Sequence, residues 1–338
     1  MRQLQAFTLG KKFGQPEANE DSLVVMPNLG YAVIDGVTDR NGTRYDGMLS
    51  GQFASRTAKR AVEYFLLAQG HADQPELQFQ GGEHFVDYLG KAIHTGYAAN
   101  NALAAVEADW KLRGGCTVMA VLLMGDRLEV VAVGDSGLRV NGNDILQVLK
   151  PLDDVTAILR RQTWQYFAAR HHSAEECDRL STSVTWQGTQ NQIDGTPTAD
   201  PEFVRLIEAD TLAACRSHLP GAPEHELLLL IQQGIAHGQG DFQNVTEPVL
   251  GYGAIDGFPV PSRYIETRSY ALADVETIEL FSDGYFKPGI DFGIASWEAA
   301  FAAVEAEDLH KIGRYMSTKG TTATQLTDDR SYLGVRFR

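Results

Sequence analysis

Short β-rich runs broken by turn residues occur near both ends of this chain and constrain its fold more than any other feature. Residues 23–35 (LVVMPNLGYAVID) have a hairpin pattern, because Pro27, Asn28 and Gly30 interrupt two runs of β-forming residues. Residues 116–150 contain three or four further runs separated by glycine turns, which favours an antiparallel meander. β character returns in 263–286 and in 331–337. The pattern predicts an α+β fold rather than alternating βαβ units.

Helical periodicity fills the intervals between these runs. Apolar residues recur at helical spacing from Met48 onward, and residues 83–110 predict a second long helix. Residues of about 151–245 are mostly helical in pattern and are interpreted as an insertion. Because the β-rich runs on its two sides are expected to share their sheets, we expect residues 1–338 to form a single domain.

The net charge of the chain limits the kinds of partner that it is expected to bind. The chain has 29 basic and 44 acidic residues, a net charge of −15, which disfavours nucleic acid and anionic membranes and favours cations. Three widely spaced cysteines predict neither a disulfide framework nor a CxxC zinc site. The N-terminal residues have no apolar signal region, and no apolar run approaches the length of a membrane span. A cytoplasmic location is expected.

Carboxylates stand at the ends of several β-rich runs. Each one alone is ordinary turn chemistry, but strand ends converge on a rim where loops carry functional groups. Converging carboxylates repel one another, and a hard divalent cation would compensate them. Since no cysteine or histidine cluster accompanies them, Mg²⁺ or Mn²⁺ is expected rather than zinc. The residues concerned are Glu20, Asp21, Asp35, Asp135, Asp283, Asp328 and Asp329.

Six segments, taken in order, resemble the motifs of the metal-dependent serine/threonine protein phosphatases of type 2C. The segments are NEDS, AVIDGVTD, GGCTVMAVLL, VAVGDSGLRV, LFSDGYF and DDRSYLGVRF. They correspond to the family motifs ED, DGxGG, GTTA, GDSR, SDG and D(N/D)xT, over roughly residues 5–140 and 246–338. The resemblance, closest to bacterial members, implies a four-layer α-β-β-α sandwich with two antiparallel sheets, to which the helical segment is added.

The resemblance also implies roles for the acidic residues. Asp35 would bridge two metal ions, the carbonyl of Gly36 would bind one of them, and Asp283 and Asp328 would complete the other. These aspartates would be the catalytic residues, acting through a metal-activated water. A side chain at position 36 would hinder the approach of that carbonyl to an ion. Glu20 and Asp21 would act through metal-bound water, and Asp135 with Asp283 would hold a third ion.

Several positions depart from the family pattern. Many members have a phosphate-binding arginine four residues before the glutamate of the ED pair, and this chain has Pro16 there. Arg40 and Arg44 are candidate phosphate-binding residues, and Lys11 and Lys12 are also nearby in sequence, although surface positions are the better interpretation for all four. Asp39 replaces the last glycine of DGxGG, and Val37 stands where the family's general-acid histidine would be expected, so no general acid is assigned.

The function expected from these features is hydrolysis of phosphoserine and phosphothreonine in proteins, a signalling activity. Two alternatives stay open at this point. One is a catalytically weak regulatory module that binds a protein partner through residues 151–245, and the other is a hydrolase for small phosphate esters.

Overall fold

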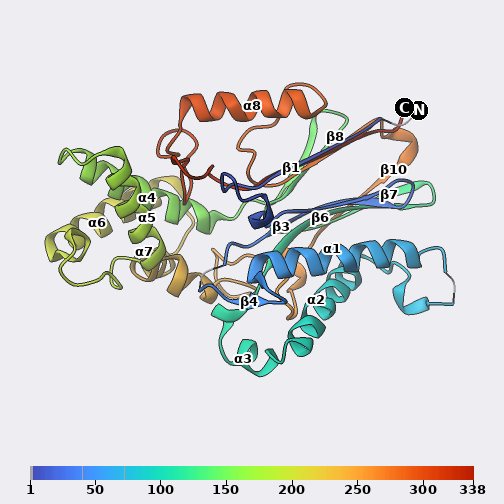
Figure 1. The fold of residues 1–338 in the computed structure, drawn as a ribbon, viewed down its shortest axis with the longest axis horizontal. Helices are drawn as coiled ribbons and strands as arrows, with labels where there is room; N and C mark the ends of the chain where they lie inside the picture. The colour runs from blue at the N-terminus through green and yellow to red at the C-terminus, as the bar shows by residue number, and fades with distance from the viewer. Residues whose placement is uncertain (1–2, 40, 72) are drawn as a thin grey trace. The chain divides into compact units, whose positions relative to one another are not determined.

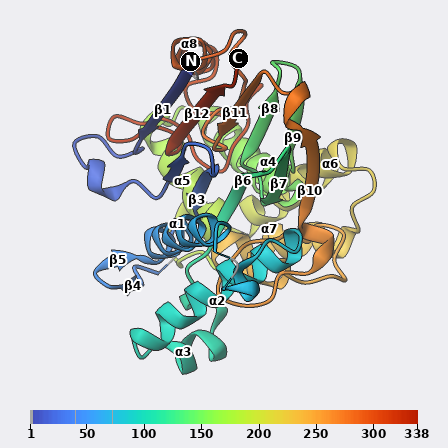
Figure 2. The ribbon, with the colours of Figure 1, turned by 90° about the vertical axis from the view of Figure 1, so that its right-hand side faces the viewer.

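Two five-stranded antiparallel sheets dominate the part of the chain that the computed structural model describes, residues 3–39, 41–71 and 73–338. The first sheet contains, in spatial order, β1 (Gln3–Leu9), β12 (Arg330–Arg336), β11 (Thr277–Phe281), β8 (Gly137–Val140) and β9 (Asp144–Gln147). The second contains β10 (Glu266–Ala271), β7 (Arg127–Val133), β6 (Cys116–Met124), β3 (Gly30–Gly36) and β2 (Ser22–Met26). The strands nearest the two ends of the chain pair with each other, Gln3 opposite Arg336 (Figure 2).

Alternation along β3 explains how the layers are built. Tyr31 and Val33 are buried in the core between the two sheets, whereas Ala32 and Ile34 are buried on the other face, against helices. Successive side chains of a strand point to opposite faces, so a strand that is apolar at every position is buried on both sides. This alternation places β3 in the middle of the structure.

Helices cover the outer face of each sheet (Figure 1). On the second sheet lie α1 (Ser50–Ala68) and α2 (Gly82–Ala99), whose Phe53 and Phe85 belong to the same core as Ile34. On the first sheet lies α8 (Ile294–Glu307), where Trp297 packs against Phe281 of β11 and Tyr332 of β12. The α+β fold and the four-layer α-β-β-α sandwich predicted from the sequence are confirmed.

The antiparallel meander predicted for residues 116–150 is wrong. β6 pairs with β7 in the second sheet, but β8 pairs with β9 and β11 in the first sheet. The chain crosses between the sheets at residues 134–136. Gly134 has a φ of +83°, and a Cβ there would lie 2.4 Å from the Thr117 side chain, so the corner requires glycine.

The single long helix predicted for residues 83–110 is also interrupted. α2 ends at Ala99, and α3 (Leu103–Ala108) follows after Asn101, whose φ of +55° lies in the left-handed region. Asparagine tolerates this conformation and commonly ends helices. Met48 lies in β5 (Met48–Leu49), which pairs with β4 (Arg44–Tyr45), so α1 begins two residues later than expected.

The described residues divide into two compact units. The sheets lie in the first unit, residues 1–149, 253–302 and 328–338; the second unit comprises residues 150–252 and 303–327. The helices of the second unit are α4 (Pro151–Ala168), α5 (Ala174–Gln187), α6 (Pro201–His218) and α7 (Glu224–Gly238). Within it the buried Arg160 donates to the Asp178 carboxylate and to the carbonyl of His310. The single domain with an insertion at 151–245 stays a prediction.

No helix among the described residues combines the length and the apolar character needed to cross a bilayer.

Candidate metal centre

Three aspartates from three different strand ends converge in the first unit. Asp35 lies near the end of β3, Asp135 lies between β7 and β8, and Asp283 lies two residues after β11. Each of them offers a carboxylate oxygen, and these oxygens lie within 4.8 Å of one another. Asp135 is buried, and the other two are partly buried. Strand order explains the meeting, since the crossing at residues 134–136 brings the second sheet to the end of β11.

The electrostatics of this group favour a bound cation. Burial raises the pKa of Asp35 well above its ordinary value, and the charges of Asp21, Asp328 and Asp135 raise it further. Burial also raises the pKa of Asp21 to about 7, with Asp329 contributing, although the hydroxyls of Ser331 and Ser282 oppose this shift. Negative charge on these residues is therefore unfavourable in the metal-free protein, and a bound cation would stabilise it.

The donor set fits Mg²⁺ or Mn²⁺, the metals expected from the sequence. Every converging ligand atom is a carboxylate oxygen, the donor that hard divalent cations prefer. Glu20 is only 3% exposed, and its buried Oε1 has no hydrogen-bond partner among the described residues. A buried carboxylate oxygen left in this state is costly unless a cation or an ordered water satisfies it.

Lys11 lies inside the acidic site, so the interpretation of this residue as a surface charge is wrong. Its side chain is 6% exposed. Its Nζ donates to Oε2 of Glu20 at 2.8 Å, to Oδ1 of Asp328 at 2.9 Å and to Oγ1 of Thr38 at 3.0 Å. Burial lowers the pKa of Lys11, but the carboxylates of Asp328, Glu20 and Asp329 outweigh it and raise the pKa well above its ordinary value.

The two aspartates before β12 have different surroundings. Asp328 accepts from Lys11 and is not one of the three aspartates whose oxygens converge within 4.8 Å. Asp329 is buried and accepts from two backbone amides, that of Lys11 at 2.6 Å and that of Glu20 at 3.0 Å. Asp329 therefore joins the segment after β1 to the segment before β2, and it holds Lys11 and Glu20 of the site in place through their backbone.

Gly36 is required by packing as well as by any role of its carbonyl. It is buried and pairs with Cys116 in the second sheet. A Cβ at this position would lie 2.5 Å from the carbonyl oxygen of Gly51 and 2.8 Å from that of Glu20. Both contacts are to backbone, which cannot move aside easily. The DG pair is therefore held between the start of α1 and the segment that carries Glu20.

The loop after Gly36 does not supply a further carboxylate to the cluster. Asp39 accepts hydrogen bonds from the amides of Asn41 and Thr43, both at 3.1 Å, and from Oγ of Ser50 at 2.6 Å. This is the turn role common for aspartate. Arg44 is exposed, and its Nη1 donates to the carbonyl of Gly47 at 2.8 Å, within the β4–β5 hairpin. Arg40, the other candidate for phosphate binding, lies outside the described residues.

Sequence reasoning missed the roles of Lys11 and Thr38. Both contact Glu20, but they are 9 and 18 residues away from it along the chain. No strand is predicted from the sequence for residues 3–9, and without the pairing of β1 with β12 Lys11 is indistinguishable from a surface residue.

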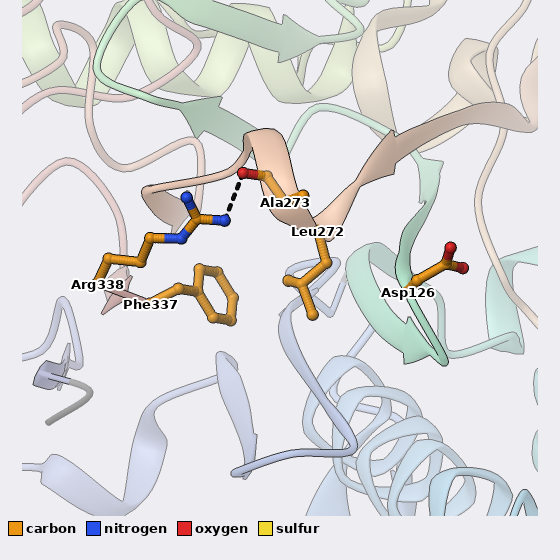
Figure 3. A pocket seen from close by; sticks show the side chains of 5 residues that line it. All are labelled: Asp126, Leu272, Ala273, Phe337 and Arg338. Carbon is orange, nitrogen blue, oxygen red and sulfur yellow. Dashed lines mark hydrogen bonds between the residues drawn. The ribbon is translucent and has the colours of Figure 1, made fainter.

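A separate surface pocket of about 340 Å³ lies at the opposite end of the strands (Figure 3). It is lined by Asp126 in the β6–β7 turn, by Leu272 and Ala273 after β10, and by Phe337 and Arg338 after β12. Asp135 of the converging aspartates follows the other end of β7, so this pocket is not part of the acidic site.

No family model and no curated protein matches this chain. Solved structures of bacterial serine/threonine phosphatases are similar to it. The serine/threonine phosphatase Stp1 from Staphylococcus aureus has 13% identity and a TM-score of 0.45, with 100% of this chain and 96% of that chain covered. The Mycobacterium tuberculosis phosphatase PstP/Ppp has 15% identity and a TM-score of 0.41, with 99% and 98% covered.

A third solved structure contains metal. The catalytic domain of the serine/threonine protein phosphatase PstP, in complex with two manganese ions, has 17% identity and a TM-score of 0.43, with 99% of this chain and 97% of that chain covered. At these identities and scores, any functional conclusion for this chain has to rest on the geometry of its own site.

Proposed function

We propose that this chain is a Mg²⁺- or Mn²⁺-dependent phosphatase that hydrolyses phosphoserine and phosphothreonine in proteins. The observation that carries the proposal is the convergence of Asp35, Asp135 and Asp283 from three strand ends. An oxygen-only site of this kind suits a hard divalent cation and leaves no role for a soft metal. The order of the acidic motifs along the sequence supports the same activity.

The residues of the site have separate roles in metal binding and in positioning the backbone. The three converging aspartates would hold the metal, and Gly36 keeps the backbone after Asp35 in place between Gly51 and Glu20. When bound, the metal lowers the pKa of a water and neutralises charge that develops on the phosphoryl group. Oε1 of Glu20, which has no partner among the described residues, is available to accept a hydrogen bond from a water in the site.

Binding of the phosphate itself is weaker than a family arginine would make it. Pro16 begins a 3-10 turn at Pro16–Ala18 and offers no donor. A hydrogen bond to a charged group is worth about 1.5–3 kcal/mol, or roughly 10- to 150-fold in affinity. We therefore expect a high KM for small phosphate esters. Arg40 and Arg44 stay candidates for contacts to the phosphate.

We further propose that the chain acts in the cytoplasm and in signalling. Three buried cysteines that form no disulfide fit a reducing cytoplasm, and a phosphoprotein substrate fits a signalling role. We also propose that the mostly helical residues 151–245 contact a protein partner.

The test is an assay of the purified chain with Mn²⁺, using p-nitrophenyl phosphate and a panel of phosphoserine and phosphothreonine peptides. Turnover of peptides that requires Mn²⁺ and stops with a chelator is the expected result. Turnover of p-nitrophenyl phosphate alone would favour the small-ester hydrolase. Absence of turnover on every substrate, in protein shown to bind Mn²⁺, would favour the regulatory module.

A further inference from the structure

Lys11 is the one basic side chain that the described residues place inside the acidic site. Its three hydrogen bonds are to Glu20, Asp328 and Thr38, at 2.8, 2.9 and 3.0 Å, and Asp329 lies 3.6 Å from the same nitrogen. A lysine ammonium has three N–H donors and no acceptor. All three donors are therefore in use, and none is left for a phosphate group.

Hydrogen bonds to the backbone of Lys11 and Glu20 hold the ammonium near its acceptor. Oδ1 of Asp329 accepts from the amide of Lys11, and Oδ2 of the same carboxylate accepts from the amide of Glu20. The lysine and its principal acceptor are thus attached to one buried carboxylate. Thr38 strengthens the arrangement, since its hydroxyl also donates to Oε2 of Glu20 at 3.2 Å.

Two carboxylates that could hold a second divalent ion are occupied by this ammonium. Glu20 and Asp328 each give one oxygen to Nζ, and neither belongs to the group of Asp35, Asp135 and Asp283, whose oxygens lie within 4.8 Å of one another. A second ion between Glu20 and Asp328 would meet the positive charge of Lys11 at short range, in surroundings that screen charge poorly. It would have to displace the lysine first.

The geometry points to a hybrid centre in which the ammonium of Lys11 takes the place of a second divalent ion. One ion binds tightly at Asp35, Asp135 and Asp283, and a second ion binds at least tenfold more weakly, because it competes with Lys11 for Glu20 and Asp328. This inference rests on the metal site of the proposed function, but it concerns the number of ions and not the reaction.

The experiment counts Mn²⁺ ions on the metal-free chain by titration calorimetry and by electron paramagnetic resonance. The wild type is expected to bind one tight ion with the spectrum of an isolated Mn²⁺. Lys11→Met removes the charge and keeps much of the side-chain length, and it is expected to gain a second tight ion and a spectrum of two coupled ions. Lys12→Met is the matched control, because it makes the same change in charge one residue further on and is expected to behave as wild type.

Two tight ions of comparable affinity on the wild type would overturn the inference, whether or not the variant folds. An unchanged ion count in a Lys11→Met protein with a cooperative thermal transition would overturn it as well. The two hypotheses fail in different ways. One tight ion without turnover would support the hybrid centre and contradict the proposed phosphatase activity. Turnover with two tight ions would support the activity and contradict the hybrid centre.

Discussion

At the scale of single residues, the acidic site combines groups that repel one another with one that holds them together. Burial and neighbouring charge raise the pKa of Asp35, so its carboxylate is unfavourable in the metal-free protein. Lys11 compensates Glu20 and Asp328 with direct hydrogen bonds. The site therefore separates into a part that needs a metal and a part that carries its own cation.

Replacing Asp35 with asparagine separates function from stability. Asp35→Asn should abolish Mn²⁺-dependent turnover and weaken binding of the tight ion by at least tenfold, because it removes a charged ligand. It should not lower the melting temperature of the metal-free protein at neutral pH, since it removes a carboxylate whose charge is disfavoured by burial. Calorimetric titration and thermal melts in chelator measure both quantities. A large drop in the metal-free melting temperature would show that Asp35 serves the fold.

Glycine at position 36 should be irreplaceable for reasons of space. Gly36→Ala is expected to destabilise the protein by about 1–3 kcal/mol, the usual cost of overpacking, because its Cβ would meet the carbonyls of Gly51 and Glu20. Gly70→Ala is the matched control, since the nearest atom there would be 3.9 Å away. Urea denaturation of the two variants makes the comparison, and equal stabilities would contradict the prediction.

At the scale of secondary-structure elements, α8 is tied to the first sheet by a bidentate ion pair. Arg330 at the start of β12 donates to Glu298 of α8 through Nε at 2.9 Å and Nη2 at 2.6 Å. Tyr285 donates to the same carboxylate at 2.7 Å. Burial opposes the charge of Glu298, but the hydrogen bonds of Arg330 and Tyr285 outweigh it, and the pKa of Glu298 is lowered.

Because the pKa of Glu298 is lowered in the folded protein, the stability that Glu298 contributes depends on pH. A carboxylate with a lowered pKa in the folded protein adds stability above its unfolded pKa and loses it as the pH falls through its folded pKa. Glu298→Gln should therefore destabilise the protein by about 1.5–3 kcal/mol at pH 7, the value of hydrogen bonds to a charged group, and by much less near pH 3. Urea denaturation at the two pH values measures the difference. A penalty that is the same at both would assign the effect to packing.

At the scale of the first unit, the crossing of the chain between sheets creates the site. β7 ends in one sheet and β8 begins in the other, and Asp135 lies in between. Asp283 follows β11, the neighbour of β8, and Asp35 lies near the end of β3, so the three aspartates come from both sheets. An ion held by them would link the two sheets at one edge.

Mn²⁺ should stabilise the folded chain through this link. At a free concentration of 100 times its dissociation constant, a ligand that binds only the folded state adds about 2.7 kcal/mol to the free energy of unfolding. We expect a corresponding rise in melting temperature that is lost in Asp283→Asn. Sodium chloride at the same ionic strength is the control for screening, because a monovalent ion does not replace a divalent ion at a site of converging carboxylates. A rise that survives in Asp283→Asn would place the stabilising ion elsewhere.

The sequence by itself determined the local features. Alternating apolar residues and turn glycines specified most strands, and the acidic residues at strand ends marked the carboxylates from which a metal site was predicted, because these signals depend on neighbours along the chain. The α+β class and the helices of residues 151–245 follow from the same kind of information. The break at Asn101 was missed because helical periodicity continues on both sides of it.

Only the tertiary structure decided which of these residues meet. The sequence predicted a meander, and the division of its strands between two sheets depends on pairing with β11, well over a hundred residues away. Lys11 looked like a surface charge because its acceptors are up to 317 residues distant, and its burial follows from the pairing of β1 with β12. Burial, and with it the strength of every charge in the site, is a property of packing between distant segments, and local sequence carries little trace of it.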